Sequence, residues 1–417
     1  MITSVNNINF TKYTNFIPVQ TKTKTALPVK TSSRNLDELT KMAQMNKMQV
    51  SFSGGRKPEK VYTKHTPDNY SGCMIGAAIG DAIGRPVECD SIDKIRDIYG
   101  LKGVTDIQTV NGIAPISEDT QLSIFTADGL IKSAIKSGND DIMPDLRDVY
   151  ASYQDWLKTQ QEQFTPSKNG WVSNIQALHS KRGQRLICAG ALASGMPGSM
   201  EFPINGIKGS DGVMRTAPAG LKYYKDPEIA FEAGARCVSL TNGSPDAYLP
   251  AGLYSAIVAN IIQGKDMPTA VDDSLRILKK YRYHEGTYKL VDKAADLSDS
   301  HMISRAAINK IGAGWNADEA IAIGVYCAMK TPDDFKTAVL AAVNHSGDSD
   351  TTGGIAGGIV GAFVGEEKIP DDWKYKVELC FELDEISKDL FNNAREIENV
   401  KEKYPVTIKK KKRIGLD

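Results

Sequence analysis

Apolar residues recur at three- and four-residue steps along most of the chain from Tyr70 onward. This spacing places them on one face of an α-helix, and runs with the two-residue alternation of a half-buried strand are nearly absent. The clearest helical segments are residues 121–137, 143–159, 228–240, 250–263, 270–281, 317–330, 333–344, 351–365 and 373–398. We therefore expect an all-α protein with a single compact multi-helix domain.

Two helical segments carry glycines at four-residue steps. The series are Gly72, Gly76, Gly80 and Gly84, and Gly353, Gly357, Gly361 and Gly365. Each glycine inside a helix costs roughly 0.5–1 kcal/mol relative to alanine, but a stripe of small residues lets two backbones approach closely. Our hypothesis is that these two helices pack antiparallel. That arrangement would place Asp81 and Glu88 near Asp348 and Asp350.

Charge divides the chain into three parts. The formal net charge is zero over 417 residues, yet residues 1–66 hold only three acids and residues 409–413 are all basic. We predict a disordered basic leader over residues 1–66, a domain over 67–398 and a basic tail over 399–417. The middle must then be acidic overall, which argues against stable nucleic-acid binding. Solubilising ends are favoured over ends that contact nucleic acid or anionic lipid.

The cysteine pattern indicates a reduced protein. The six cysteines are scattered and none forms a CxxC pair, so neither a disulfide framework nor a zinc site is indicated. The chain has no apolar run of 18 residues and its N-terminus has no apolar signal core. We expect a cytoplasmic protein that is monomeric and does not enter a membrane.

Two acidic motifs each stand at the start of a helix: Ser-Glu-Asp-Thr at 117–120 and Gly-Asp-Ser-Asp-Thr at 347–351. In one interpretation these are ordinary helix starts, with a capping hydroxyl and acids in the first turn. In the other, they join Glu88 to offer the oxygen ligands that Mg²⁺ or Mn²⁺ prefers. Two carboxylates 4 Å apart repel by about 4 kcal/mol at an effective dielectric of 20, so a cluster would need protons or cations.

Five blocks in order along the chain resemble the ADP-ribosylglycohydrolase family, which is related to the dinitrogenase-reductase-activating glycohydrolases. They are GCMIGAAIGDAIGRPVE (72–88), SEDTQLSIFTADGL (117–130), KGSDGVMRTAPAGL (208–221), LTNGSPDAYLPAGL (240–253) and NHSGDSDTTGGIAGGIVGAFVG (344–365). The resemblance covers residues 71–390. It implies an all-α single domain with two Mg²⁺ (or Mn²⁺) ions.

The resemblance also implies roles for particular residues. The metal-ligand positions are Ser117, Glu118, Asp119, Asp348, Asp350 and Thr351. Glu88 and Asp119 are the implied catalytic residues, with Glu88 or a metal-site aspartate accepting a proton from the attacking water. The motif departs from the family's Thr-Asp-Asp at two positions. Ser117 replaces threonine but keeps the hydroxyl, and Glu118 replaces aspartate and is longer by one methylene.

The implied substrate-binding residues lie in two glycine-containing loops. They are Gly209, Ser210, Asp211, Gly212, Met214 and Asn242. Ser210 and Asp211 stand where the family has asparagine and glycine or two small residues, and Asn242 replaces a histidine. Asparagine cannot titrate near neutrality. Nearby Arg215 is open to two interpretations, a phosphate partner or a structural partner of a local acid.

These features predict a metal-dependent ADP-ribosyl hydrolase that acts on an ADP-ribosylated protein or small molecule. The departures at Asp211, Asn242 and Ser244, the last also at a histidine position of the family, motivate an alternative, a catalytically impaired ADP-ribose-binding pseudo-hydrolase. A metal-free carboxylate glycosidase is a further alternative, against which the pairing of hydroxyls with acids in both motifs argues. A purely structural protein, with every acid a helix cap, would leave the five ordered blocks unexplained.

Overall fold

The structure is a computed structural model that describes residues 63–183 and 186–407. Nearly all of the predicted leader and the end of the predicted tail therefore lie outside the described residues. The described residues belong to one compact unit, Lys60–Asp417. They form helices joined by loops, and their only β-pairing consists of isolated bridges. The all-α prediction is confirmed for this part of the chain.

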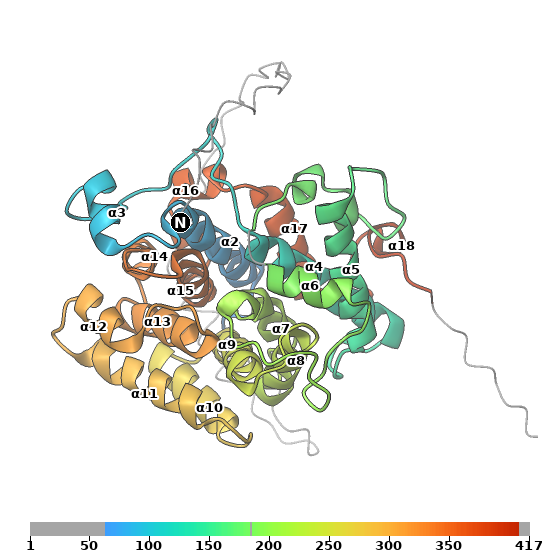
Figure 1. The fold of residues 1–417 in the computed structure, drawn as a ribbon. Coiled ribbons are helices and arrows are strands. Elements are labelled where there is room, and N and C mark those ends of the chain that lie inside the picture. The colour runs from blue at the N-terminus through green and yellow to red at the C-terminus, as the bar shows by residue number, and fades with distance from the viewer. Residues whose placement is uncertain (1–62, 184–185, 408–417) are drawn as a thin grey trace, which may run out of the picture. The chain divides into compact units, whose positions relative to one another are not determined.

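Figure 1 shows the helices and the loops that join them. Their bounds are α2 (Pro67–Gly84), α3 (Ile92–Tyr99), α4 (Glu118–Ser137), α5 (Leu146–Gln161), α6 (Leu186–Ala193), α7 (Ala217–Lys222), α8 (Pro227–Ser239), α9 (Pro245–Ile262), α10 (Met267–Leu278), α11 (Glu285–Asp299), α12 (Ser304–Ile311), α13 (Ala317–Lys330), α14 (Phe335–Val343), α15 (Ser349–Val364), α16 (Asp371–Lys376), α17 (Cys380–Phe391) and α18 (Val400–Lys403). Short 3₁₀ turns that concern the site are η1 (Arg85–Val87), η4 (Ser210–Gly212) and η5 (Met214–Thr216).

The helix predicted over 373–398 is wrong as a single element, because it divides into α16 and α17. Between them the backbone is extended at Val377 and left-handed at Leu379, whose φ is 64°. The interruption has a partner far away in sequence. The Ala114 N–H donates to the Lys376 carbonyl, and the Glu378 N–H donates to the Ala114 carbonyl. These long-range bonds hold the segment out of the helical conformation.

Helices α2 and α15 form an antiparallel pair at the centre of the fold, as the glycine series predicted (Figure 1). An ideal Cβ on Gly72, Gly76 or Gly80 would lie 2.4, 2.5 or 1.9 Å from the carbonyl oxygens of Gly361, Gly357 and Gly353, respectively. The partner's residue number falls as the first helix advances, which defines the antiparallel direction. The glycines are needed because any side chain there would meet backbone.

This pairing positions the candidate site. The C-terminal end of α2 leads through η1 to Glu88. The N-terminal end of α15 lies beside it, and Asp348 is the N-cap of that helix. Helix α4 starts beside them, because its N-cap Ser117 is hydrogen-bonded to Asp81 of α2. Three segments that are distant in sequence therefore meet at one end of the central pair.

The C-terminal part of the described chain continues to pack beyond residue 398. Tyr404 is buried, and its hydroxyl donates to Asp389 at 2.7 Å. The backbone N–H of Trp171 donates to the Lys403 carbonyl at 3.1 Å. Residues 399–404 therefore contact the helical domain.

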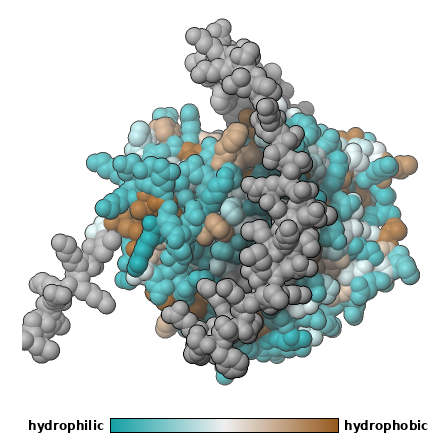
Figure 2. Space-filling model, turned by 180° about the vertical axis from the view of Figure 1, so that it is seen from behind, coloured by the Kyte–Doolittle hydropathy of each residue, from teal (hydrophilic) through white to brown (hydrophobic). Residues whose placement is uncertain are grey.

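None of the described helices combines the length and the apolar character needed to cross a bilayer. On the face drawn in Figure 2, hydrophilic residues make up most of the surface that the described residues form, and apolar residues lie scattered among them.

Candidate metal centre

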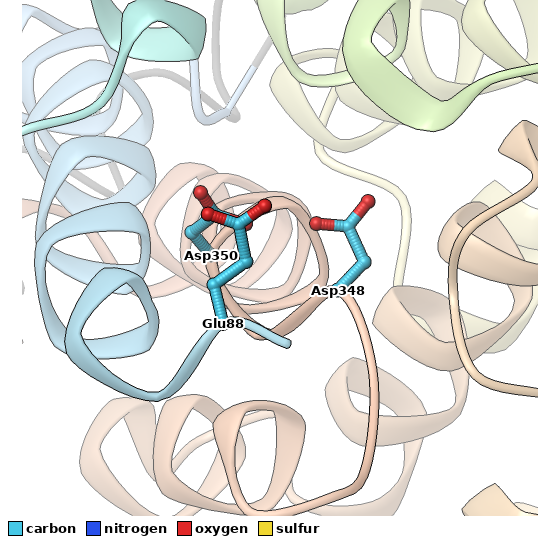
Figure 3. A group of neighbouring side chains, drawn as sticks. All are labelled: Glu88, Asp348 and Asp350. Atoms are coloured by element: carbon cyan, nitrogen blue, oxygen red, sulfur yellow. The ribbon is translucent and has the colours of Figure 1, made fainter. Parts of the chain in front are cut away.

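Three carboxylates gather where α2 ends and α15 begins. Glu88, Asp348 and Asp350 each offer an oxygen, and these oxygens lie within 4.8 Å of one another. Figure 3 shows that Glu88 arrives from the α2 side and the two aspartates from the start of α15. Both aspartates are buried, whereas Glu88 is half-buried. The proximity expected from the glycine pairing is therefore confirmed.

The electrostatics of this group favour a bound cation. Burial raises the pKa of Asp350 well above its ordinary value, and the neighbouring charges of Asp348 and Glu88 raise that pKa further. Either protons or a cation can relieve such repulsion. The donors are all carboxylate oxygens, with no sulfur or imidazole, so the group fits a hard divalent ion such as Mg²⁺ or Mn²⁺.

The motif at the start of α4 touches the motif at the start of α15. Thr351 donates its hydroxyl hydrogen to Oδ2 of Asp119 at 2.9 Å. Ser117 caps α4 by accepting the Asp119 N–H on its Oγ at 3.1 Å. The helix-cap interpretation is therefore confirmed for Ser117, and Asp119 contacts α15. The metal role of this motif remains a prediction.

Glu118 points away from this contact. An ideal Cβ on Gly183 would lie 1.9 Å from the carboxyl carbon of Glu118, so that carboxyl lies against the 180–183 loop. Consecutive residues on a helix project about 100° apart, so Glu118 and Asp119 point in different directions. The structure brings Asp119 to the other motif. The metal role of Glu118 remains a prediction.

Asp81 is a site residue to which sequence reasoning gave a place but no role. It is fully buried, and both of its carboxylate oxygens accept the Ser117 N–H, at 3.1 and 3.0 Å. It also accepts the hydroxyl hydrogen of Thr120. Burial raises the pKa of Asp81 to about 6 despite these hydrogen bonds. The signal for this residue was an acid within the apolar stretch of α2 that follows Ser71.

The loop at η4 is tied to the same centre. Ser210 donates its hydroxyl hydrogen to Oδ2 of Asp348, and the Ser210 N–H donates to the Trp315 carbonyl at 3.2 Å. Gly209 pairs with Asn316 in an isolated bridge. Trp315, beside this loop, is 39% exposed.

Other predicted loop residues take packing positions. An ideal Cβ on Gly212 would lie 2.7 Å from a methyl of Val238, and one on Gly354 would lie 2.3 Å from the sulfur of Met214. Met214 is buried. Gly212 and Met214 therefore seat the loop against α8 and α15, and their predicted contact with substrate is not tested by these positions.

Two of the departures from the family pattern, Asp211 and Asn242, contact each other. The Asn242 amide donates to Oδ1 of Asp211 at 2.9 Å, and Thr241 donates its hydroxyl hydrogen to Oδ1 of Asn242 at 2.7 Å. Asp211 and Asn242 are both buried. Oδ2 of Asp211 has no hydrogen-bond partner among the described residues. The acid that stands where small residues were expected is thus held in place by the amide that stands where histidine was expected.

Arg215 is part of this buried network. It is fully buried and donates to Cys188 Sγ at 3.2 Å and to Thr241 Oγ1 at 2.6 Å. Its guanidinium lies 4.9 Å from the centre of the Tyr153 ring. Of the two interpretations, the structural one fits these contacts, although the partners are a thiol, a hydroxyl and an aromatic ring.

The fold is thus a helical domain with an acidic centre at one end of two glycine-lined helices. The family model described as ADP-ribosylglycohydrolase matches residues 63–399, and the chain belongs to this family. It is 23% identical to ADP-ribosylhydrolase ARH3 of Mus musculus over 353 residues, covering 77% of this chain and 90% of that protein. It is 24% identical to the ADP-ribosyl-[dinitrogen reductase] glycohydrolase of Rhodospirillum rubrum over 319 residues, covering 76% and 92%.

Two further comparisons support the same assignment. The ADP-ribosylarginine hydrolase Tri1 of Pseudomonas putida is 21% identical over 335 residues, with 80% of each chain covered. A solved structure titled "ADP-ribosylglycohydrolase-related protein complex" aligns with a TM-score of 0.51 at 18% identity, covering 79% of this chain and 98% of that chain. The structural likeness confirms the all-α fold.

Proposed function

We propose that this protein is a metal-dependent ADP-ribosyl hydrolase that removes ADP-ribose from modified protein side chains or from small ADP-ribosylated groups. One observation carries the proposal: Glu88, Asp348 and Asp350 converge within 4.8 Å. The contact between Asp119 and Thr351 joins the second motif to this cluster. Family membership supplies the class of substrate.

Two Mg²⁺ or Mn²⁺ ions would be held by Asp348, Asp350, Thr351 and Asp119, with Ser117 and Glu118 as the remaining predicted ligands. Bound there, divalent ions would orient the ribose hydroxyls and stabilise developing charge. Asp81 and Ser210 contact the ligand-bearing segments. Their hydrogen bonds to Ser117 and Asp348 would hold these segments in place before substrate arrives.

The chemistry assigned to this chain is hydrolysis at the anomeric carbon of the distal ribose. The bond from that carbon to the acceptor atom breaks, and a water oxygen forms the new bond. Glu88 is half-buried at the edge of the cluster, which suits a group that accepts the water's proton. The proton then passes to the departing acceptor atom, so charge and atoms balance.

The test compares arginine-, serine- and carboxylate-linked ADP-ribosyl peptides, each with Mg²⁺ and with excess EDTA. We expect release of ADP-ribose from at least one linkage with Mg²⁺ and none with EDTA. Asp119→Asn and Asp350→Asn should abolish release, whereas Asp372→Asn, an exposed carboxyl paired with Lys376, should leave it unchanged. Full activity after complete metal removal would sink the mechanism.

The alternative is an ADP-ribose-binding protein without turnover. The buried contact between Asp211 and Asn242 favours it, because Asn242 cannot titrate as a histidine would. Calorimetry with ADP-ribose separates the two proposals. Binding to the wild-type chain without release from any of the three linkages would identify the binding protein.

A further inference from the structure

A basic recess lies outside the acidic centre, between the region of α3 and helices α12 and α14. These elements lie on the same side of the domain in Figure 1. The recess has a volume of about 350 Å³. Its lining includes Arg96 of α3, Lys102 of the following turn and Arg305 of α12, and no acidic residue.

The three cations of this basic recess have no partners among the residues that the structure describes. None of them forms an ion pair or a side-chain hydrogen bond with another described residue. Lys94, on the same helix as Arg96, shows the usual contrast, because it pairs with Asp90 at 2.5 Å. Like charges around one concavity repel, and an anion is the ligand that removes this repulsion.

Neutral donors complete the lining. The recess includes the hydroxyl-bearing residues Thr105 and Ser304, and Ser304 is the first residue of α12. The N-cap of that helix is Ile303, which provides no capping side-chain bond. Hydroxyls beside guanidinium and ammonium groups are typical of sites for phosphate oxygens.

The wall of the recess is fixed by specific contacts. The Asn344 side chain accepts the Val104 N–H and donates to the Val104 carbonyl, both at 2.8 Å. Gly103 has a φ of +73°, and a Cβ there would lie 2.0 Å from Oδ1 of Asn344. The turn that carries Lys102 is therefore held against the end of α14 rather than left to move independently.

The recess is separate from the acidic centre but connected to it along two segments. Ile92 and Asn344 line the recess, and each stands four residues from a carboxylate of the centre, Glu88 and Asp348. The Ile92 N–H also donates to Ser346 Oγ at 2.8 Å. An anion in the recess would therefore contact the segments that also carry Glu88 and Asp348.

We propose that the basic recess of Arg96, Lys102 and Arg305 binds a phosphate group. The phosphate comes either from a free anion or from a part of the substrate beyond the ADP-ribose unit that is cleaved. This inference concerns a second site, and its primary test requires no turnover.

The test is calorimetric titration with inorganic pyrophosphate in EDTA, at constant ionic strength set with chloride. The Arg96→Ala/Arg305→Ala variant should bind at least tenfold more weakly than the wild type, because each guanidinium supplies a charge-assisted contact. The control Arg282→Ala/Lys289→Ala removes the same charge from exposed positions outside the recess and should keep wild-type affinity. Lys102→Gln, at an exposed position, should weaken binding at least threefold. This single variant tests the proposal independently if the double variant fails to fold.

Equal affinities in the recess and control variants would overturn the proposal, as would the absence of pyrophosphate binding by the wild type. Kinetic arms then separate the sources of phosphate. A higher KM in the double variant only for substrates that carry a second diphosphate identifies the substrate as the source. An unchanged KM for every substrate, with weaker pyrophosphate binding, identifies a free anion.

Discussion

Replacing Gly80 by alanine would place a methyl group against the backbone of α15. The added Cβ would lie 1.9 Å from the carbonyl oxygen of Gly353 and 2.3 Å from its carbonyl carbon. Ordinary van der Waals contact begins near 3.4 Å, so the helices must separate by about 1.5 Å, and no rotamer change can relieve the overlap. Overpacking costs about 1–3 kcal/mol, and alanine returns about 1 kcal/mol of helix propensity.

Because the methyl group would meet only backbone atoms of α15, we take the upper end of that cost. The net loss in the free energy of unfolding is then about 2 kcal/mol. An unfolding entropy of about 2.1 cal/mol/K per residue over about 340 residues converts this loss to a fall of about 3 °C in Tm. The affinity for Mn²⁺ should also fall, because the same pair of helices carries Glu88 and the two aspartates. Thermal unfolding and Mn²⁺ calorimetry measure the two effects.

Gly190 provides the matched control for this substitution. It also lies inside a helix, α6, but an ideal Cβ there would have no atom within 4 Å. Gly190→Ala should therefore raise Tm by about 1 °C through helix propensity alone. A Gly80→Ala protein with wild-type Tm and Mn²⁺ affinity would refute the argument, as would an equal loss of stability in Gly190→Ala.

Three further outcomes are expected. Asp81→Asn should weaken Mn²⁺ binding about 10–100-fold, because the carboxylate that orients Ser117 is lost, and calorimetry that shows unchanged affinity would remove Asp81 from the site. In EDTA, the raised pKa of Asp81 (about 6, against 3.8) means that the folded state holds more protons between pH 4 and 6. The free energy of unfolding of the wild type relative to Asp81→Asn should therefore fall by about 3 kcal/mol as pH rises through that window, and then level off. Urea titrations that show this difference rising with pH would contradict a raised pKa for Asp81. Arg215→Met should lower the stability by about 3 kcal/mol, since buried partners lose a charged donor, whereas wild-type stability with much weaker ADP-ribose binding would restore a phosphate role for Arg215.

Local patterns in the chain were sufficient to predict most of the longer helices and the central pair. Helical periodicity and glycine spacing are properties of neighbouring residues, so the segment 317–330 coincides with α13 and the two glycine series identified α2 and α15 as partners. The acids at their ends followed from the antiparallel direction. The resemblance of five ordered blocks then indicated the family that the comparisons confirm.

Tertiary contacts decided the details that sequence reasoning missed. The break between α16 and α17 arises from backbone bonds to Ala114, and Asp81 acquires its role only because α4 begins beside it. The contact of Asp211 with Asn242 joins positions 31 residues apart, and that of Asp119 with Thr351 joins positions 232 apart. The sequence by itself determined which oxygen ligands and small residues are present and on which helix faces they lie. Which of these carboxylates meet, and which one turns away as Glu118 does, depends on the packing of helices brought together from the whole chain, and local periodicity contains no information about that packing.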